Sequence, residues 1–448
     1  MMEASLSQKY NVSAPRYTSY PTVPYWDHDS FSVAKWTKVI SETYISHADE
    51  GISLYIHLPY CESLCTYCGC NTRITKNHRV EGPYITALLK EWAMYCDILG
   101  SKPKIKELHL GGGTPTFFSA ANLAWLVEGI LKNAHVAKDA QLSFEAHPAN
   151  TTTDHLETLY NLGFKRLSLG IQDFDPKVQV MINRFQTPGQ VSRVANYARL
   201  LGYNSINFDL IYGLPGQNVE GLAETINKVI QLKPDRIAFY SYAHVPWLKP
   251  GQRHFTEKDL PVGDEKFALY QKGREMLIDG GFHDVGMDHF ALKNDSLYQA
   301  SQAKSLHRNF MGYTDQHTHL LIGLGVSSIS DGWNGFAQNP RTVEAYLSRI
   351  SEGMIPVEKG HILTCEDLEN RKHILGIMCR EKTYFKNEIP EHISDRLWPL
   401  SEDGLIVFDK NTIQLTHLGK SYIRNVCMVF DERLWTKQVE NQLFSSSI

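Results

Sequence analysis

Four of the chain's eight cysteines lie within ten consecutive residues, in the segment CESLCTYCGC. They are Cys61, Cys65, Cys68 and Cys70. Thiolates from one compact loop can bind an iron–sulfur cluster, and the first three of these cysteines are spaced to hold three corners of a cubane. Only Gly69 separates Cys68 from Cys70, so in an extended backbone their side chains point to opposite faces, and we expect Cys70 to point away from such a cluster. Three ligands leave one iron open, as a catalytic metal site requires.

A structural zinc site is the alternative interpretation of the same cysteines. Zinc sites usually combine two ligands from one loop with two from elsewhere in the chain, and no second pair follows at suitable spacing. The other four cysteines are scattered singly, at Cys96, Cys365, Cys379 and Cys427. The sequence shows no cationic start followed by an apolar run and no apolar stretch long enough to span a membrane. We therefore expect reduced thiols in a cytoplasmic protein.

The elements that must position this loop alternate along the chain. The expected strands are 52–58, 104–110, 141–146, 165–172, 204–212 and 235–243. Amphipathic segments of helical period lie between them, among them 80–99, 119–134, 188–202 and 217–232. This alternation predicts an α/β fold in which a parallel sheet with helical crossovers closes into a barrel or partial barrel. A chain of 448 residues, 42% of them hydrophobic, has ample material for such a core.

Glycine-rich and polar residues follow these strands at their carboxyl ends, where barrels of this kind place their chemistry. The cysteine loop follows the first strand, and the segment GGGTPT at 111–116 follows the second. The later strands carry or precede Glu145, Gln172, Asp209 and His244. Loops attract polar residues in general, but six successive strands with such residues predict one site at this end of the barrel.

The cysteine loop resembles the CxxxCxxC signature of radical S-adenosylmethionine (SAM) enzymes. Longer segments, in order along nearly the whole chain, resemble the oxygen-independent coproporphyrinogen III oxidases of that superfamily. These segments are KYNVSAPRYTSYPT, YIHLPYCESLCTYCGCN, GGGTPT, NFDLIYGLPGQ, YAHVPW, RNFMGYT and LIGLGVSSIS. The CxxxCxxC spacing alone indicates only the superfamily, whereas Cys70 and the segment PRYTSYP are narrower signals of this family.

The resemblance implies a partial (β/α)6 barrel, similar to a TIM barrel and of the radical SAM type. It divides the chain into a substrate-covering segment (1–50), the catalytic barrel (51–290), an extension that closes the barrel mouth (291–360) and a mainly α-helical, winged-helix-like domain (361–448). Winged helices often bind DNA, but residues 361–430 carry nine Lys and Arg against ten Asp and Glu. The net charge of the chain is -4, so we expect no nucleic-acid partner.

The resemblance also implies the cofactors. Cys61, Cys65 and Cys68 would hold a [4Fe-4S] cluster, and SAM would occupy the fourth iron. The first SAM site would contain Tyr55, Gly112, Glu145 and Ile329. A second SAM, for which this family is known, would contact Tyr67, Gly113, Thr114, Gln172, Arg184, Asp209 and Ala243. The chemistry of several of these residues suits the ligand, because glycines allow close backbone approach, carboxylates accept from ribose hydroxyls or an ammonium group, and a guanidinium pairs with a carboxylate.

The substrate implied by the resemblance, coproporphyrinogen III, carries four propionates and needs cations among flat apolar surfaces. Two segments outside the six strands offer that combination, and they are Arg16 with Tyr17 and Tyr20, and Arg308 with Phe310 and Tyr313. We place Cys70, Arg308, Phe310 and Met311 at the reaction itself. Met311 departs from the glutamine expected of the family, and methionine can keep the packing of an amide side chain but not its hydrogen bonds.

The reaction implied is the oxygen-independent conversion of two propionates to vinyl groups, which gives protoporphyrinogen IX in haem biosynthesis. The expected partners are the porphyrinogen and an electron donor such as flavodoxin or ferredoxin, with no membrane and a monomeric chain. The alternative within the superfamily is a haem-binding chaperone, whose members typically lack a cysteine at the position of Cys70 and the long N-terminal covering segment. A structural zinc protein is the third possibility.

Overall fold

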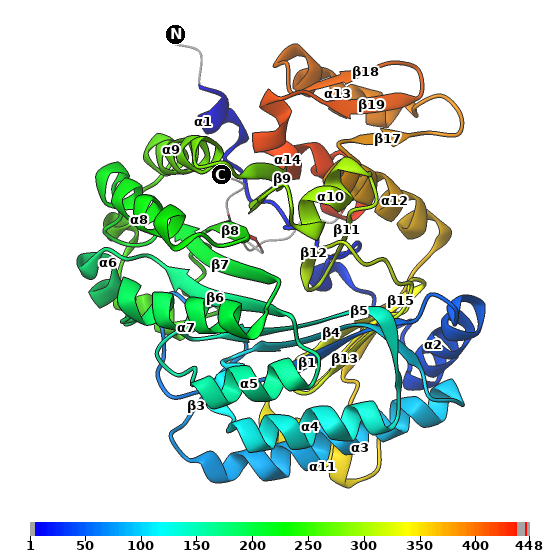
Figure 1. Cartoon of the computed structure of the whole chain (residues 1–448). Coiled ribbons are helices and arrows are strands. Elements are labelled where there is room, and N and C mark those ends of the chain that lie inside the picture. The colour runs from blue at the N-terminus through cyan, green and yellow to red at the C-terminus, as the bar shows by residue number, and fades with distance from the viewer. Residues whose placement is uncertain (1–4, 437–443, 446–448) are drawn as a thin grey trace.

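The computed structural model describes residues 5–436 and 444–445. Its centre is a sheet of twelve strands in the order β16-β15-β14-β13-β1-β4-β5-β6-β7-β8-β10-β9. The six strands expected from the sequence lie side by side and parallel, and they are β1 (Ile52–Leu58), β4 (Lys104–Gly112), β5 (His135–Ala146), β6 (Arg166–Gln172), β7 (Ser205–Tyr212) and β8 (Arg236–Ser241). The mixed α/β fold with a large parallel sheet is therefore confirmed, and Figure 1 shows the curvature of the sheet.

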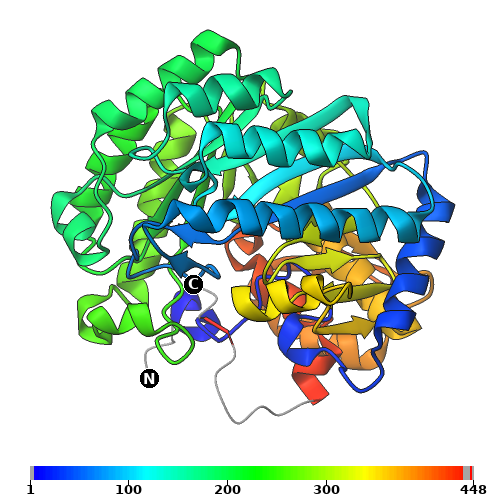
Figure 2. The same ribbon diagram turned by 90° about the horizontal axis from the view of Figure 1, so that it is seen from below.

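Helices follow the outer side of this sheet in a continuous row (Figures 1 and 2). They are α2 (Val33–His47), α3 (Glu81–Leu99), α4 (Ala120–Lys132), α5 (Thr153–Asn161), α7 (Pro188–Leu201), α8 (Val219–Leu232), α9 (Asp264–Asp279) and α11 (Val343–Ser351). Side-chain caps begin several of them, since the hydroxyl of Ser119 accepts from the N–H of Asn122 and Thr187 forms a capping box with Gln190. The row and the strands beneath it bury one large apolar core, in which Trp92, Leu108 and Phe144 are inaccessible.

The sheet extends beyond the six strands at both edges. Strand β13 (Leu321–Leu324) pairs with β1 in parallel, with Ser53 opposite Leu321, and this pairing was not predicted. Antiparallel strands continue that edge, and they are β14 (Ile329–Asp331), β15 (Gly335–Gln338) and β16 (Lys359–Ile362). At the other edge β10 (His289–Ala291) and β9 (His283–Gly286) follow β8. Residues 291–360 thus supply a parallel strand of the sheet in addition to loops above it.

Short elements surround the open end of the sheet. They are α1 (Leu6–Tyr10), β2 (Tyr60–Cys61), β3 (Arg73–Ile74), α6 (Pro176–Met181), α10 (Ser296–Gln302) and the hairpin of β11 (His307–Asn309) and β12 (Gly312–Thr314). The 3-10 helices are Val23–Tyr25, His78–Val80, Pro115–Phe117, Pro250–His254, Glu257–Asp259 and Leu418–Tyr422. The hairpin β11–β12 is tied to the sheet, since the hydroxyl of Thr314 donates to the carboxylate of Glu107 at 2.8 Å.

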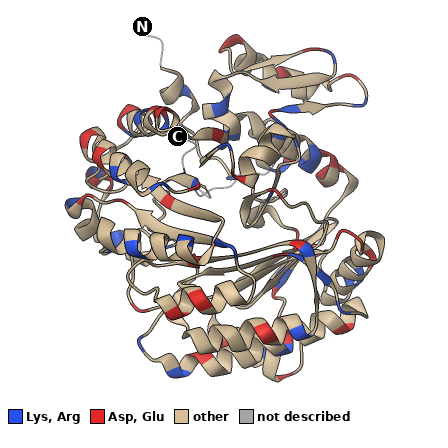
Figure 3. Ribbon diagram, viewed as in Figure 1, with Lys and Arg blue, Asp and Glu red and all other residues tan. Residues whose placement is uncertain are grey.

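The C-terminal region contains three antiparallel strands in the order β17-β19-β18 and several helices. The elements are α12 (Cys365–Arg380), β17 (Lys382–Tyr384), α13 (Glu391–Glu402), β18 (Ile406–Phe408), β19 (Thr412–Leu415), α14 (Ile423–Met428) and α15 (Glu432–Thr436). Blue and red residues are interspersed over the helices in Figure 3. No helix among the described residues is both long and apolar enough to cross a membrane.

A second apolar core joins the two ends of the chain. Tyr17 and Tyr20, from the N-terminal segment, are 2% exposed and pack with side chains of α12, α13 and α14. The hydroxyl of Tyr17 donates to Asp431 at 3.1 Å, and Nε of Arg424 donates to the carbonyl of Pro15 at 3.1 Å. The N-terminal segment is therefore held by the last part of the chain as well as by the sheet.

Candidate active site

A cavity of about 940 Å³ lies at the carboxyl ends of the parallel strands. Its wall contains all four clustered cysteines and most of the other predicted site residues. These residues are Tyr67, Gly112, Gly113, Thr114, Glu145, Gln172, Arg184, Asp209, Ala243 and Met311. The prediction that the strand ends converge on one site agrees with this arrangement, because residues up to 250 positions apart face the same space.

Hydrogen bonds hold the cysteine loop to a neighbouring segment on each side. On one side, the backbone N–H of Thr66 donates to the carbonyl of Ile182 at 3.0 Å. On the other side, the amide of Gln252, in the 3-10 helix Pro250–His254, donates to the carbonyl of Tyr67 at 2.9 Å. These bonds fix the backbone of the loop, so its thiols are presented by a supported scaffold.

Two of the thiols have polar contacts within the cavity. Sγ of Cys61 lies 3.3 Å from the hydroxyl of Thr114, and Nη1 of Arg184 donates to Sγ of Cys65 at 3.7 Å. Burial raises the pKa of Cys61 to about 12 although the Thr114 hydroxyl acts in the opposite direction. Burial also raises the pKa of Cys65, against the lowering effect of Arg184. A cation in the cavity would therefore stabilise the thiolate forms that burial disfavours.

Cys70 does not point away from its neighbour, as the sequence argument expected. The thiols of Cys68 and Cys70 are close enough to interact, and this interaction lowers the pKa of Cys68 and raises that of Cys70. The expectation assumed an extended backbone, whereas the loop turns between Cys65 and Cys68, where the N–H of Cys68 donates to the carbonyl of Cys65 at 3.1 Å, and it bends again at Cys70. The geometric reason for leaving Cys70 out of the ligand set is therefore wrong.

The glycine loop after β4 touches the cysteine loop directly. Gly112 has φ +115°, and a Cβ there would lie 2.7 Å from the ring of His57. A Cβ on Gly113 would lie 2.6 Å from the carbonyl oxygen of Pro59. Only glycine fits at either position without displacement, so the two loops form one continuous floor of the cavity.

Glu145 lies at the end of β5 and faces this glycine loop. Its carboxylate accepts from the backbone N–H of Gly112 at 3.2 Å and lies 3.4 Å from Nε2 of His109. Burial acts to raise the pKa of Glu145, but the hydrogen bond and charge of His109 and the Gly112 N–H outweigh it, so the pKa is lowered. The group is an anionic acceptor suited to hydroxyl or ammonium donors.

Asp209 and Arg184 form the opposite part of the wall. The carboxylate of Asp209 accepts from the hydroxyl of Ser168 and from the amide of Asn207, both at 2.8 Å, and burial raises its pKa to about 6. Arg184 is 8% exposed, donates to the carbonyl of Gly170, and has no hydrogen-bond partner for Nε among the described residues. A buried donor without a partner is costly, so this nitrogen is available to an anionic ligand.

Four predicted residues lie outside the cavity wall. Tyr55 is behind the glycine loop, with its hydroxyl 3.1 Å from Nδ1 of His57. Ile329 and Phe310 pack against a small core that includes Phe336. Arg308 is 4% exposed and lies behind Tyr313, with its guanidinium 4.6 Å from the centre of that ring. Their roles toward cofactor and substrate stay predictions.

In the first of the two expected substrate-binding segments, the arginine and the two tyrosines lie in different surroundings. Arg16 reaches the cavity wall, where it pairs with Asp288 at 3.3 Å and donates to the carbonyl of Ser241. Tyr17 and Tyr20 do not, because both are buried in the second core. The expectation that these tyrosines present flat surfaces to the substrate is therefore wrong, and the reason is their long-range packing against the C-terminal helices.

Known proteins resemble this chain in both sequence and structure. A family model described as the radical SAM superfamily matches residues 55–229. Oxygen-independent coproporphyrinogen III oxidases from Salmonella typhimurium and Pseudomonas aeruginosa are each 36% identical to the chain, covering 97% and 100% of it and 96% and 98% of their own lengths. The chain belongs to the oxygen-independent coproporphyrinogen III oxidase family. A solved coproporphyrinogen III oxidase from Escherichia coli, described as a radical SAM enzyme, is 35% identical, with a TM-score of 0.87 over 93% of this chain and 97% of that one.

Membership of this oxidase family implies a [4Fe-4S] cluster and SAM, and the residues present fit both groups. Three buried or half-buried thiols share the cavity floor, and two of them have pKa values raised by burial, which a cationic cluster would offset. Gly113 lets the glycine loop pack directly against the backbone of Pro59, which brings Thr114 to within 3.3 Å of Sγ of Cys61 in the cavity wall. The unpartnered Nε of Arg184 provides a donor for a carboxylate.

Several histidines and a tyrosine of the oxidase cavity were not singled out in the sequence. The cavity wall contains His109, His147, Tyr240 and His289, and His57 lies next to the wall, against Gly112. Burial lowers the pKa of His147 and of His289 to about 3, so both rings are neutral near pH 7. His57 and His109 each lie between two apolar residues of a strand, and this alternation of polar and apolar residues was the signal in the sequence that could have identified them.

His244, by contrast, was expected at the site because it follows the last parallel strand. It is not part of the cavity wall, and Nδ1 lies 3.1 Å from the hydroxyl of Tyr242 instead. The residue therefore packs beside the wall in a small apolar group that includes Phe255. His244 is thus a polar residue of the loop after β8 that does not line the cavity.

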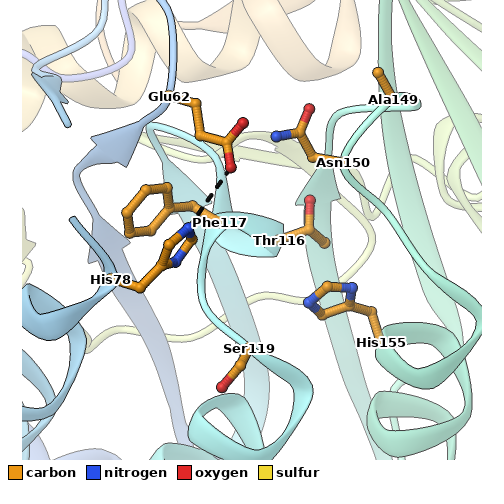
Figure 4. A pocket seen from close by; sticks show the side chains of 8 residues that line it. All are labelled: Glu62, His78, Thr116, Phe117, Ser119, Ala149, Asn150 and His155. Atoms are coloured by element: carbon orange, nitrogen blue, oxygen red, sulfur yellow. Dashed lines mark ion pairs between the residues drawn. The ribbon is translucent and has the colours of Figure 1, made fainter. Parts of the chain in front are cut away.

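A smaller pocket of about 400 Å³ opens beside the cysteine loop (Figure 4). Glu62, which precedes the second cysteine, pairs there with His78 at 3.7 Å, and the ring of His78 stacks on Phe117 with centres 4.4 Å apart. None of the clustered cysteines lines this pocket. It shares Glu62, Ala149 and Asn150 with the main cavity, so it is a side chamber of the same site.

Proposed function

We propose that this chain converts coproporphyrinogen III to protoporphyrinogen IX by oxidative decarboxylation of two propionates without oxygen. The observation that carries the proposal is the placement of Cys61, Cys65 and Cys68 in the floor of one large cavity. When bound, the [4Fe-4S] cluster and SAM supply an organic radical that removes a hydrogen atom from the carbon of a propionate next to the macrocycle. The cavity volume of about 940 Å³ is at the upper end of small-molecule sites, as a porphyrinogen together with SAM requires.

The chain's own residues would bind and orient these groups. Cys61, Cys65 and Cys68 would ligate the cluster, and Cys70, beside Cys68, would line the space next to it. Glu145 would accept hydrogen bonds from one SAM, near Gly112, Tyr55 and Ile329. Arg184 and Asp209 would hold the carboxylate and the ammonium or ribose of a second SAM. The other residues proposed around it are Tyr67, Gly113, Thr114, Gln172 and Ala243.

The substrate carboxylates would be met by the cations between the cavity and the second core. Arg308 is buried, and its Nε and Nη1 have no hydrogen-bond partner among the described residues. Its Nη2 donates to the carbonyl of Arg16 at 3.2 Å, so the two guanidinium groups belong to neighbouring segments. A carboxylate is the group that satisfies such a fork of donors, which supports Arg308 and Arg16 as propionate ligands.

Met311 would contact substrate or the second SAM through packing alone. Its backbone N–H donates to the side chain of Asn309 at 2.8 Å, which fixes the tip of the hairpin β11–β12, and its side chain reaches the cavity wall. Phe310 would support this tip from behind, through its contact with Phe336 at 5.8 Å between ring centres. The hydrogen bonds of a glutamine at this position would then be supplied by other groups of the wall.

The division of the chain and its partners form the remainder of the proposal. The shared core of residues 1–50 and 361–448 supports a covering segment held by a C-terminal domain, around the barrel of 51–290 and its extension of 291–360. The substrate partner would be coproporphyrinogen III, with a flavodoxin- or ferredoxin-like electron donor, and the chain would act as a monomer in the cytoplasm. The 45 Lys and Arg residues are nearly balanced by 49 Asp and Glu residues, and the two kinds are interspersed along the ribbon in Figure 3, which supports the absence of a nucleic-acid partner.

The test is an anaerobic assay of reconstituted protein with coproporphyrinogen III, SAM and a reductant. Wild-type protein should release two carbon dioxide molecules per porphyrinogen and consume two SAM molecules. Cys65→Ala should lose the cluster and all SAM cleavage, whereas the exposed Cys365→Ala is the matched control and should keep both. If SAM is cleaved but the porphyrinogen is returned unchanged while haem binds stoichiometrically, the chaperone alternative replaces this proposal.

A further inference from the structure

Two histidines and a glutamate meet at the amino-terminal end of the sheet, opposite the cysteine loop. His47 is the last residue of α2, Glu50 lies in the loop before β1, and His319 lies just before β13. Because β1 and β13 are parallel neighbours with Ser53 opposite Leu321, the residues that precede both strands are brought to the same place. We call His47, Glu50 and His319 the basal site.

The carboxylate of Glu50 bridges the two rings of the basal site. Oε1 lies 3.0 Å from Nδ1 of His47, and Oε2 lies 2.7 Å from Nδ1 of His319. The two rings stack with their centres 3.7 Å apart. One ligand atom from each of the three residues lies within 4.8 Å of the others. Tetrahedral zinc with bonds of about 2.0–2.1 Å holds its ligand atoms about 3.3 Å apart, so the ligand atoms would need to approach one another by about 1.5 Å at most.

The surroundings favour a bound ion over a simple hydrogen-bonded trio. The three side chains are 34%, 36% and 19% exposed, so an ion can enter from solvent. The ring of Trp333 lies 4.6 Å from that of His319 and limits the movement of this ligand on one side. Two imidazoles and one carboxylate are a ligand set that zinc uses widely, with water in the fourth position.

We propose that the basal site binds one divalent transition-metal ion of the zinc class. The ion would join α2, which ends the N-terminal segment, to the start of β13. The strand β1 separates it from the cysteine loop, and seven residues of strand span roughly 20 Å at about 3.3 Å per residue. The site is therefore independent of the cluster, and the proposal goes beyond the proposed function.

The test uses tag-free, full-length protein with its iron–sulfur cluster reconstituted, so that the clustered thiols are occupied. Zinc chloride alone is the probe, and bound zinc is measured by equilibrium dialysis and elemental analysis. Wild-type protein should bind one zinc per chain at this site. His319→Ala and Glu50→Gln should each weaken that binding by more than about tenfold, since loss of even an outer contact costs this much. His135→Ala, an exposed histidine on β5, is the matched control and should bind as wild type does.

X-ray absorption at the zinc edge identifies the ligands. The expected result is a shell of nitrogen and oxygen at about 2.0–2.1 Å without sulfur at about 2.3 Å. Glu50→Gln keeps the size of the side chain, with one oxygen that accepts from one ring and an NH2 group that can donate to Nδ1 of the other, so it remains informative if His319→Ala fails to fold. Absence of zinc binding, a sulfur shell, or equal binding by wild type and Glu50→Gln would each overturn the proposal.

Discussion

Replacing Gly113 with alanine tests whether the glycine loop and the cysteine loop form one rigid floor. The added Cβ would lie 2.6 Å from the carbonyl oxygen and 2.7 Å from the carbonyl carbon of Pro59, and 3.0 Å from the carbonyl oxygen of Leu58. All three are backbone atoms. The same carbonyls accept hydrogen bonds at 2.8 Å, from the N–H of Arg73 and of Gly113 itself, so neither can move without loss of a bond.

The magnitude follows from this geometry. Ordinary van der Waals contact begins at 3.4 Å, so the loops must separate by several tenths of an ångström. Overpacking of this kind costs about 1–3 kcal/mol, and the upper half of the range applies because no flexible side chain can yield. We expect Gly113→Ala to lower the free energy of unfolding by about 2–3 kcal/mol and to weaken SAM binding, because Thr114 moves away from Cys61 with the loop.

The assay is equilibrium urea unfolding of the reconstituted protein, followed by SAM binding under anaerobic conditions. Gly189→Ala is the matched control, since Gly189 lies in the first turn of α7 and a Cβ there would meet only Oγ1 of Thr187 at 3.8 Å. Alanine in a helix is favoured over glycine by about 0.5–1 kcal/mol, so the control should be unchanged or slightly more stable. Equal stability and equal SAM affinity of Gly113→Ala and Gly189→Ala would contradict a rigid contact between the two loops.

Three further substitutions test other parts of the argument. Cys70→Ser should keep the visible absorbance of the cluster, because three other cysteines hold it, but should reduce substrate turnover; a colourless protein would place Cys70 among the ligands. Asp295→Ala should lower the free energy of unfolding, measured in urea, by about 3–5 kcal/mol, because it leaves Arg236, its ion-pair partner at 2.5 Å, buried and without that partner. The double variant Asp295→Ala with Arg236→Met should recover part of this loss. No recovery would contradict the role of the ion pair. Burial raises the pKa of Asp209 from 3.8 to about 6. Between these two pH values the folded protein keeps a proton that the unfolded chain has lost, so the free energy of unfolding falls as the pH rises through about 6. Wild type should lose about 1 kcal/mol between pH 5 and pH 7.5 relative to Asp209→Asn in the same measurement, and an equal pH dependence of the two proteins would count against the shift.

The parallel strands could be predicted from the sequence because each is a short apolar run between helices of clear period. Strand β1, for example, is predicted at 52–58 and observed at Ile52–Leu58. Strand β13 could not be predicted in the same way. Its four residues, Leu321–Leu324, form too short an apolar run to distinguish strand from helix, and its partner β1 lies far away in the sequence.

The site shows the same division between local and long-range information. Cysteine spacing and strand ends identified the cavity wall, because both depend on residues close in sequence. The orientation of Cys70 required the turn of the loop, and the burial of Tyr17 and Tyr20 required contacts with helices more than 350 residues away. Sequence periodicity contains neither kind of information.

The core shared by the two ends of the chain also determines the order of events during synthesis. Proteins emerge from the ribosome N-terminus first, so the barrel strands can assemble before the final helices exist. Tyr17 cannot be buried until α14 and Asp431 have been made, because these supply its packing and its hydrogen-bond partner. Burial of Tyr17 and Tyr20 must therefore wait for the C-terminal helices, whereas β1 and β4, which carry the loops of the cavity floor, pair with strands that are made earlier.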